Sequence, residues 1–127
     1  MDISERYINM CRGAEIQKNW NKTIGDYYSN ILNKVSIIFY GYIRCEEREW
    51  YGGTYNRNEL ILDSAIWLPR QDQLQGMLIL SQFKVTFLDR FCKFAKSNWY
   101  DSMEQLWLAF VMQEKYNKVW DGEWIEG

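Results

Sequence analysis

The side chains that most often perform acid–base and metal chemistry are scarce in this chain of 127 residues. It contains no histidine, which removes the most common general base and the most common metal ligand together. The three cysteines, Cys11, Cys45 and Cys92, form no CxxC pair, so a zinc site would need distant ligands. No glycine-rich phosphate loop of a common type occurs. We therefore expect neither a cofactor nor a bound metal.

Two acidic side chains in a charged segment are spaced so that they could share a catalytic site. Strand alternation would put Glu47 and Glu49 on one face, as a metal-dependent nuclease would need. The alternative is an exposed strand end whose opposite charges, including Arg44 and Arg48, face solvent. The inventory as a whole favours a protein that is not an enzyme.

The segment around Pro69 holds the most suggestive side chains for ligand binding. Trp67 supplies an indole and Arg70 a guanidinium, and the amides of Gln71 and Gln73 follow at the start of an expected helix. Such a group could bind a planar, hydrogen-bonding anion such as a nucleotide. Alternatively, Trp67 fills the core while Arg70 and the glutamines face water. The sequence leaves both interpretations open.

A second group of candidate binding residues follows the Gly52-Gly53 pair, which we interpret as a turn. Its aromatic and basic side chains belong either to an exposed strand surface or to the wall of a pocket. The candidate ligand-binding residues are therefore Trp67, Arg70, Gln71, Gln73, Tyr55 and Arg57.

Apolar spacing predicts four helices that would position these residues. Residues 2–20 carry one apolar face, while the opposite, polar side is expected to face solvent with Glu5, Arg6, Asn9 and Arg12. Pro69 is expected to begin a short second helix. Four phenylalanines at helical spacing predict a third over residues 82–96.

The clearest local signal marks a fourth helix near the C-terminus. Ser102 and Gln105 fit a capping box, Trp107 and Phe110 belong to the expected buried face, and Asn117 is a plausible left-handed stop. The tail that follows is expected to close as a hairpin around an Asp-Gly turn. Otherwise its two tryptophans, Trp120 and Trp124, pin the terminus to the core.

Strands are expected in the first half of the chain, over residues 27–32, 35–43 and 59–62, where β-branched and aromatic residues gather. The order of helix, strands and helices favours the α+β class, with about four helices packed on a small antiparallel sheet of about three strands. We expect residues 1–127 to form a single domain. Aromatic residues make up 17% of the chain, which favours burial of some of them in a homo-oligomer.

Charge and hydropathy exclude several kinds of partner. The net charge is −2 and no basic block occurs, so we expect no binding to duplex nucleic acid. No apolar run approaches the ~20 residues that cross a membrane, and the first ten residues lack the apolar stretch of a signal peptide. The odd number of widely spaced cysteines agrees with a cytoplasmic location.

Three segments of the chain resemble a known group of proteins. They are RYINMCRGAEIQKNW (residues 6–20), IWLPRQDQLQGML (residues 66–78) and DSMEQLWLAFVMQEKYNKVWDGEWI (residues 101–125). They are similar to small uncharacterised phage and prophage proteins of clostridia and related bacteria. The resemblance brings no catalytic residue with it, but it implies a biological context.

That context implies a non-enzymatic phage accessory protein that counters bacterial host defence by binding, in the cytoplasm of the infected host. The first ligand to consider is a nucleotide-derived immune signal that the protein would sequester. One alternative is a protein-binding inhibitor that occludes a host defence enzyme with an exposed aromatic surface. Others are a structural or regulatory phage protein and the metal-dependent nuclease considered above.

Overall fold

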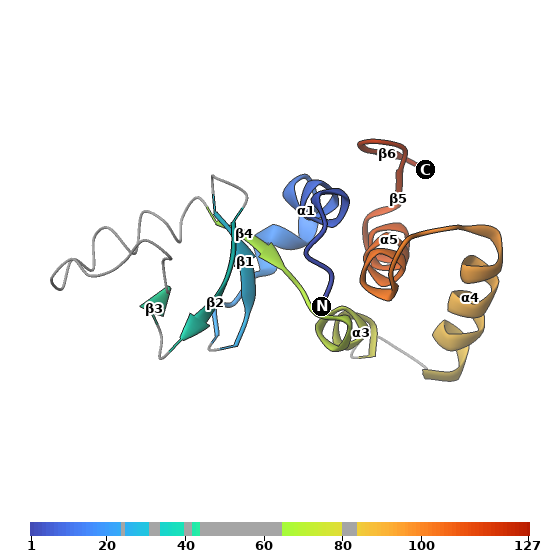
Figure 1. Cartoon of the computed structure of the whole chain (residues 1–127). Helices are drawn as coiled ribbons and strands as arrows, with labels where there is room; N and C mark the ends of the chain where they lie inside the picture. Colours follow the sequence, from blue (N-terminus) through green and yellow to red (C-terminus); the bar gives the residue numbers. More distant parts are fainter. Residues whose placement is uncertain (24, 31–33, 40–41, 44–64, 80–83) are drawn as a thin grey trace, which may run out of the picture.

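A computed structural model describes residues 1–23, 25–30, 34–39, 42–43, 65–79 and 84–127 (Figure 1). Within these ranges the expected α+β class is confirmed. The expected strand at residues 59–62 and the candidates Glu47, Glu49, Tyr55 and Arg57 lie outside the described residues. The helices are α1 (Glu5–Arg12), the 3-10 helix η1 (Glu15–Asn19), α3 (Gln71–Ile79), α4 (Lys84–Ser97) and α5 (Met103–Tyr116). The strands are β1 (Tyr27–Ser29), β2 (Val35–Phe39), β3 (Tyr42–Ile43), β4 (Ile66–Leu68), β5 (Lys118–Trp120) and β6 (Trp124–Glu126).

The larger sheet is antiparallel, with the strand order β3-β2-β1-β4. β1 lies between β2 and β4, and Tyr28 is paired with Ser36 on one side and with Trp67 on the other. The prediction of a single strand over residues 35–43 was wrong, because this stretch holds two strands, β2 and β3, that pair antiparallel. β4 was not among the expected strands. Three residues are too few to show the alternation that identifies a strand in a sequence.

The prediction of one helix over residues 2–20 was wrong. α1 ends at Arg12, Ala14 adopts an extended conformation, and the chain continues as η1. Gly13 follows the last helical residue, where glycine commonly ends a helix. The break redirects the chain, so that Ile16 is fully buried and the side-chain amide of Gln17 exchanges two hydrogen bonds of 2.9 Å with the backbone of Trp67.

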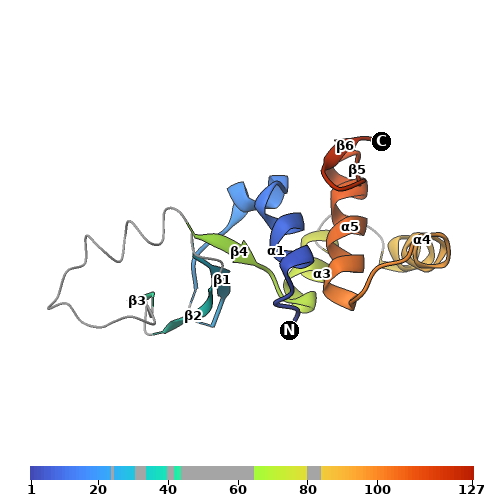
Figure 2. The same ribbon diagram turned by 45° about the horizontal axis from the view of Figure 1, so that its top comes forward.

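The helices form a cluster beside the sheet, with α5 at its centre. Figures 1 and 2 show the sheet at one end, α1 and α3 next to it, α5 beyond them and α4 at the opposite end. The sheet meets the helices through β4, whose neighbour α1 donates a hydrogen bond from the Tyr7 hydroxyl to the Pro69 carbonyl oxygen at 2.6 Å. The buried residues of α5 are Gln105, Trp107, Leu108, Ala109, Phe110, Val111 and Met112.

Both predicted ends of α5 are confirmed. The Ser102 hydroxyl accepts a hydrogen bond from the Gln105 backbone N–H at 3.1 Å, and Asn117 is left-handed, with φ 54° and ψ 44°. The expected hairpin then follows, with Trp120 paired with Trp124 across the Asp-Gly turn. Gly122 has a φ of 81°, a conformation that glycine adopts without strain.

A cluster of polar side chains joins the N-termini of α1 and α5. The Asp2 carboxylate accepts hydrogen bonds from the Ser102 hydroxyl, from the Gln105 side-chain amide at 2.8 Å and from the Ser4 backbone N–H at 2.8 Å. We call this group of four residues the Asp2 cluster. Negative charge is favourable at this position because both helix N-termini carry partial positive charge.

The Asp2 cluster makes stability depend on pH. Burial alone would raise the pKa of Asp2, but the hydrogen bonds from Ser102, Ser4 and Gln105 outweigh it, so the pKa lies below the ordinary value of 3.8. The contribution of the carboxylate is therefore present above pH 3.8 and is lost as the pH falls through the lower, folded-state pKa. We expect Asp2→Asn to destabilise the protein by up to about 1 kcal/mol at neutral pH, because the group is partly solvated.

Thermal unfolding of wild type and Asp2→Asn, followed from neutral pH down to about pH 2, measures this effect. The two melting curves should differ at neutral pH and converge in acid. Asp89→Asn removes an exposed carboxylate on α4, paired with Lys93, and is the matched control. A difference between Asp2→Asn and wild type that does not shrink in acid would contradict the assignment to this carboxylate.

Candidate functional site

Trp67, the aromatic member of the expected binding site, belongs to the core. Its side chain is 5% exposed, and its ring stacks parallel to that of Trp20, with 6.1 Å between the centroids. The alternative interpretation, in which Trp67 fills the core, is therefore confirmed. An indole enclosed in this way presents no free face to a ligand.

Arg70 and Gln73 belong to a hydrogen-bond network around the buried carboxylate of Asp26. Asp26 is 2% exposed and accepts hydrogen bonds from Trp20 Nε1 at 2.9 Å, from the Thr23 backbone N–H at 3.0 Å and from Gln73 Nε2 at 2.7 Å. Arg70 Nη1 lies 3.8 Å from the same carboxylate and donates to the backbone carbonyl of residue 25 at 3.0 Å. We call these side chains the Asp26 network; it holds the start of β1 against the start of α3.

The remaining contacts of Arg70 are also internal to the protein. Its backbone N–H donates to Gln73 Oε1 at 2.8 Å, which caps the start of α3, and its Nε donates to Asp72 at 3.1 Å. The Arg70 side chain is 37% exposed, so it does not simply face water as the alternative interpretation had it. Gln71 is half-buried at the first position of α3, and none of the hydrogen bonds described for this network involves it. The structure thus brings Trp67, Arg70 and Gln73 together as structural residues.

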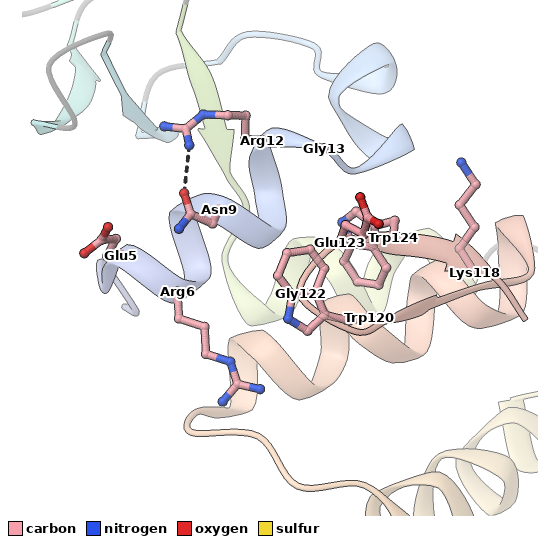
Figure 3. A pocket seen from close by; sticks show the side chains of 10 residues that line it. All are labelled: Glu5, Arg6, Asn9, Arg12, Gly13, Lys118, Trp120, Gly122, Glu123 and Trp124. Carbon is pink, nitrogen blue, oxygen red and sulfur yellow. Dashed lines mark hydrogen bonds between the residues drawn. The ribbon is translucent and has the colours of Figure 1, made fainter.

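A different part of the surface forms an open groove of about 860 Å³, between α1 and the β5-β6 hairpin (Figure 3). One wall is the polar side of α1, where Glu5, Asn9 and Arg12 are exposed to solvent as expected, and the other is the hairpin. The lining residues are Glu5, Arg6, Asn9, Arg12, Gly13, Lys118, Trp120, Gly122, Glu123 and Trp124. We call this feature the α1-hairpin groove.

The hairpin is held against α1 at two points. Trp124 Nε1 donates to the Met10 carbonyl oxygen at 2.8 Å, and its ring lies against Gly13, where an added Cβ would be only 3.4 Å away. Lys118 forms a 2.6 Å ion pair with Glu15. The hydrogen bond from Lys118 lowers the pKa of Glu15, and the same contact raises the pKa of Lys118. The width of the groove is therefore fixed by contacts to α1 and η1.

Trp120 differs from Trp124 in that its polar atom is not used to hold the hairpin. The two rings meet edge to face, with 5.0 Å between the centroids. Trp120 is half-buried, and within the described part of the chain its indole N–H donates no hydrogen bond. Figure 3 shows its indole directed toward the α1 side of the groove. A half-exposed ring with an available donor can stack on a planar ligand and bond to it at the same time.

Cationic side chains lie at both ends of the α1 wall. Figure 3 shows the guanidinium of Arg6 near one end, and that of Arg12 at the other, donating to Asn9 at 2.7 Å. Lys118 also lines the groove, but its charge is neutralised by the ion pair with Glu15. The groove therefore combines an indole surface with the two guanidinium groups of α1.

Comparisons with known proteins do not assign a function to this groove. No protein-family model matches the chain, and no curated protein or solved structure matches it. Function has to be argued from the residues themselves.

The described residues contain neither a metal-ligand cluster nor a helix that could span a membrane. Among them, no three His, Cys, Asp or Glu side chains converge as metal ligands would. None of the helices in the described ranges has both the length and the apolar character that crossing a bilayer requires. Cys11 is buried, and burial raises the pKa of its thiol, so this cysteine is protected from reaction.

Proposed function

We propose that this protein acts by binding, and that the α1-hairpin groove binds a planar, anionic small molecule of the nucleotide class. The observation that carries the proposal is the half-buried Trp120 indole with an available N–H, in a groove whose other wall carries Arg6 and Arg12. An indole face stacks on any nucleobase, and guanidinium groups bind phosphate through paired hydrogen bonds.

The size of the groove supports a small ligand. Its volume of about 860 Å³ lies within the range of roughly 300–1,000 Å³ that is usual for small-molecule sites. The anchoring of Trp124 to Met10 means that this wall is formed before a ligand arrives, which lowers the entropic cost of binding. The proposed site replaces the segment around Pro69, whose polar groups stabilise the fold.

The biological role that we propose is that of a phage accessory protein that counters host defence by sequestering a nucleotide-derived signal in the bacterial cytoplasm. The resemblance to phage and prophage proteins supports this role, as does the lack of histidine in the chain. A sequestering protein needs no catalytic group, because binding alone lowers the concentration of the signal. Nucleotides should therefore be recovered unchanged after incubation with the protein.

Calorimetric titration with cyclic and linear adenine and guanine nucleotides tests the proposal. We expect Trp120→Ala to weaken binding roughly tenfold to a hundredfold, because stacking on an aromatic ring contributes about 1–3 kcal/mol per base. Trp120→Phe keeps a stacking face but loses the N–H, so it should show an intermediate affinity. Native mass spectrometry of the purified protein would show any co-purifying nucleotide and the number of subunits together.

Arg12→Ala and Arg90→Ala form a matched pair for the same titration. Arg90 lies on α4, outside the groove, where it pairs with Glu114 at 2.8 Å. Arg12→Ala should weaken nucleotide binding, whereas Arg90→Ala should bind like wild type. Absence of binding by wild type, or equal effects of the two substitutions, would contradict the proposed site.

A second candidate function is that of a protein-binding inhibitor, which one surface feature favours. Trp99 is 84% exposed in the connection between α4 and α5, and Met103 and Ile3, 46% and 56% exposed, are neighbours in sequence of the Asp2 cluster. Exposed aromatic and apolar side chains of this kind are typical of surfaces that bind another protein. If no nucleotide binds to wild type, this candidate becomes the leading one.

A further inference from the structure

At one end of the α1-hairpin groove, the positive charge of Arg6, which could bind an anionic ligand, is paired with Asp101. Arg6 Nη1 lies 2.9 Å from Asp101 Oδ2, and the side chains are 38% and 61% exposed. The Arg6 guanidinium carbon is 5.3 Å from the centre of the Tyr100 ring. Arg6 therefore lines the groove while its charge is turned toward the start of α5.

This pair is weakly held, because solvent screens both partners. Double-mutant measurements on exposed pairs of this kind generally give small coupling energies. Asp101 also has a favourable place without Arg6, since it precedes the N-cap Ser102 and negative charge is stabilised at a helix N-terminus. When Arg6 is not paired with Asp101, the Tyr100 ring still lies beside its guanidinium. Separating the pair thus leaves neither side chain in a poor environment.

We propose that the anionic group of the ligand is a phosphate monoester, and that it replaces Asp101 as the partner of Arg6. This inference rests on the proposed function, because it assigns the two ends of a nucleotide to two places in the groove: the base to Trp120 and the phosphate to Arg6. A phosphate monoester carries a charge of about −1.5 to −2 at neutral pH and several acceptor oxygens, so it competes well with one carboxylate. Asp101 is then an internal competitor that lowers the affinity of the site.

The test is whether the affinity for a nucleoside monophosphate rises when the competing carboxylate of Asp101 is removed. We would titrate wild type, Asp101→Asn and Asp89→Asn with adenosine monophosphate and guanosine monophosphate, and with the two uncharged nucleosides. Asp101→Asn should bind the monophosphates about two- to fivefold more tightly than wild type, which is the factor that corresponds to a weak surface pair. The nucleosides should bind equally well to both proteins.

Asp89→Asn is the control for net charge. Asp89 forms an exposed pair with Lys93 on α4, and its substitution removes the same single charge as Asp101→Asn. We expect it to bind the monophosphates like wild type. Arg6→Ala should lose most of the advantage of monophosphate over nucleoside, and Arg6→Lys should recover part of it, because lysine keeps the charge but not the paired donors.

The possible results separate the two proposals. If wild type binds a monophosphate but Asp101→Asn binds it no more tightly, the role of Asp101 is overturned and the proposed function stands. An equal gain in Asp89→Asn would show an effect of net charge and would overturn the inference as well. If wild type binds none of these compounds but binds a cyclic nucleotide, the inference fails and the proposed function stands. If wild type binds no nucleotide of either kind, both proposals fail. Should Asp101→Asn prove unfolded by its melting curve, Asp101→Ser, which also removes the charge and leaves the N-cap Ser102 in place, is used instead with the same expectations.

Discussion

Trp107→Ala is expected to lower the free energy of unfolding by about 3–5 kcal/mol, the usual cost of removing a large aromatic side chain from a core. Trp107 is 4% exposed and stacks on Phe91 with 3.8 Å between the ring centroids, while Phe87 and Phe110 meet it edge to face. The substitution would remove one of the two aromatic rings of α5 that contact the phenylalanines of α4, the other being that of Phe110. Thermal melting should show a decrease in Tm of about 10–20 °C, or aggregation on expression.

The matched control is Trp99→Ala, which makes the same chemical change at a side chain that is 84% exposed. Its effect on stability should be within about 0.5 kcal/mol. Trp107→Phe is informative too, because the Trp107 indole N–H is buried and has no hydrogen-bond partner among the described residues. Phenylalanine keeps an aromatic ring and removes that unpaired donor, so we expect a much smaller loss of unfolding free energy than for Trp107→Ala. A Trp107→Ala protein with the Tm of wild type would show that α4 is not held in this way.

Asp26→Ala is expected to cost a similar amount, about 3–5 kcal/mol, for a different reason. The substitution would leave the Trp20 indole N–H, the Thr23 backbone N–H and the Gln73 amide without their acceptor. A hydrogen bond to a charged group contributes about 1.5–3 kcal/mol, and because these three donors lie in partly buried or exposed residues their losses do not add in full. Arg70 would also lose the carboxylate 3.8 Å from its Nη1. Urea denaturation of wild type and variant measures the difference directly.

Asp72→Ala is the control for the Asp26 substitution. Asp72 pairs with the same arginine, at 3.1 Å from Nε, but its side chain is 71% exposed. Loss of this pair should change stability by about 1 kcal/mol or less. If the two substitutions had equal effects, the stabilising role of the Asp26 network would be refuted, and the residues near Pro69 would return as candidates for ligand binding.

The parts of the fold that could be predicted from the sequence are those set by local chemistry. The cap at Ser102, the left-handed residue Asn117 and the Asp-Gly turn each depend on residues within one or two turns of the chain. The phenylalanine stripe of α4 is a periodic signal of the same kind. The α+β class followed from the order of these elements.

The site could not be predicted because its contacts are distant in the sequence. Arg70 and Gln73 looked available for a ligand, since nothing local reveals that Asp26 comes to lie beside them. The polar side of α1 does face solvent as expected, with Glu5, Asn9 and Arg12 exposed, but nothing local reveals that a hairpin far along the chain forms a second wall beside it. The one usable signal was the pair Trp120 and Trp124 near the C-terminus, of which Trp124 anchors the hairpin to α1.

The two hydrogen bonds between Gln17 and Trp67 also determine what cannot bind to this protein. The backbone N–H and C=O of Trp67 point away from β1, and the Gln17 amide satisfies both, as a further strand would. At this residue the outer edge of β4 is closed to strand addition by another chain. At this point of the edge a partner has to recognise side chains, and the Trp67 backbone offers no template to a misfolded copy. Gln17→Glu would keep the acceptor for the Trp67 backbone N–H but lose the donor to the Trp67 carbonyl oxygen. That carbonyl oxygen would then be open to a hydrogen bond from another chain.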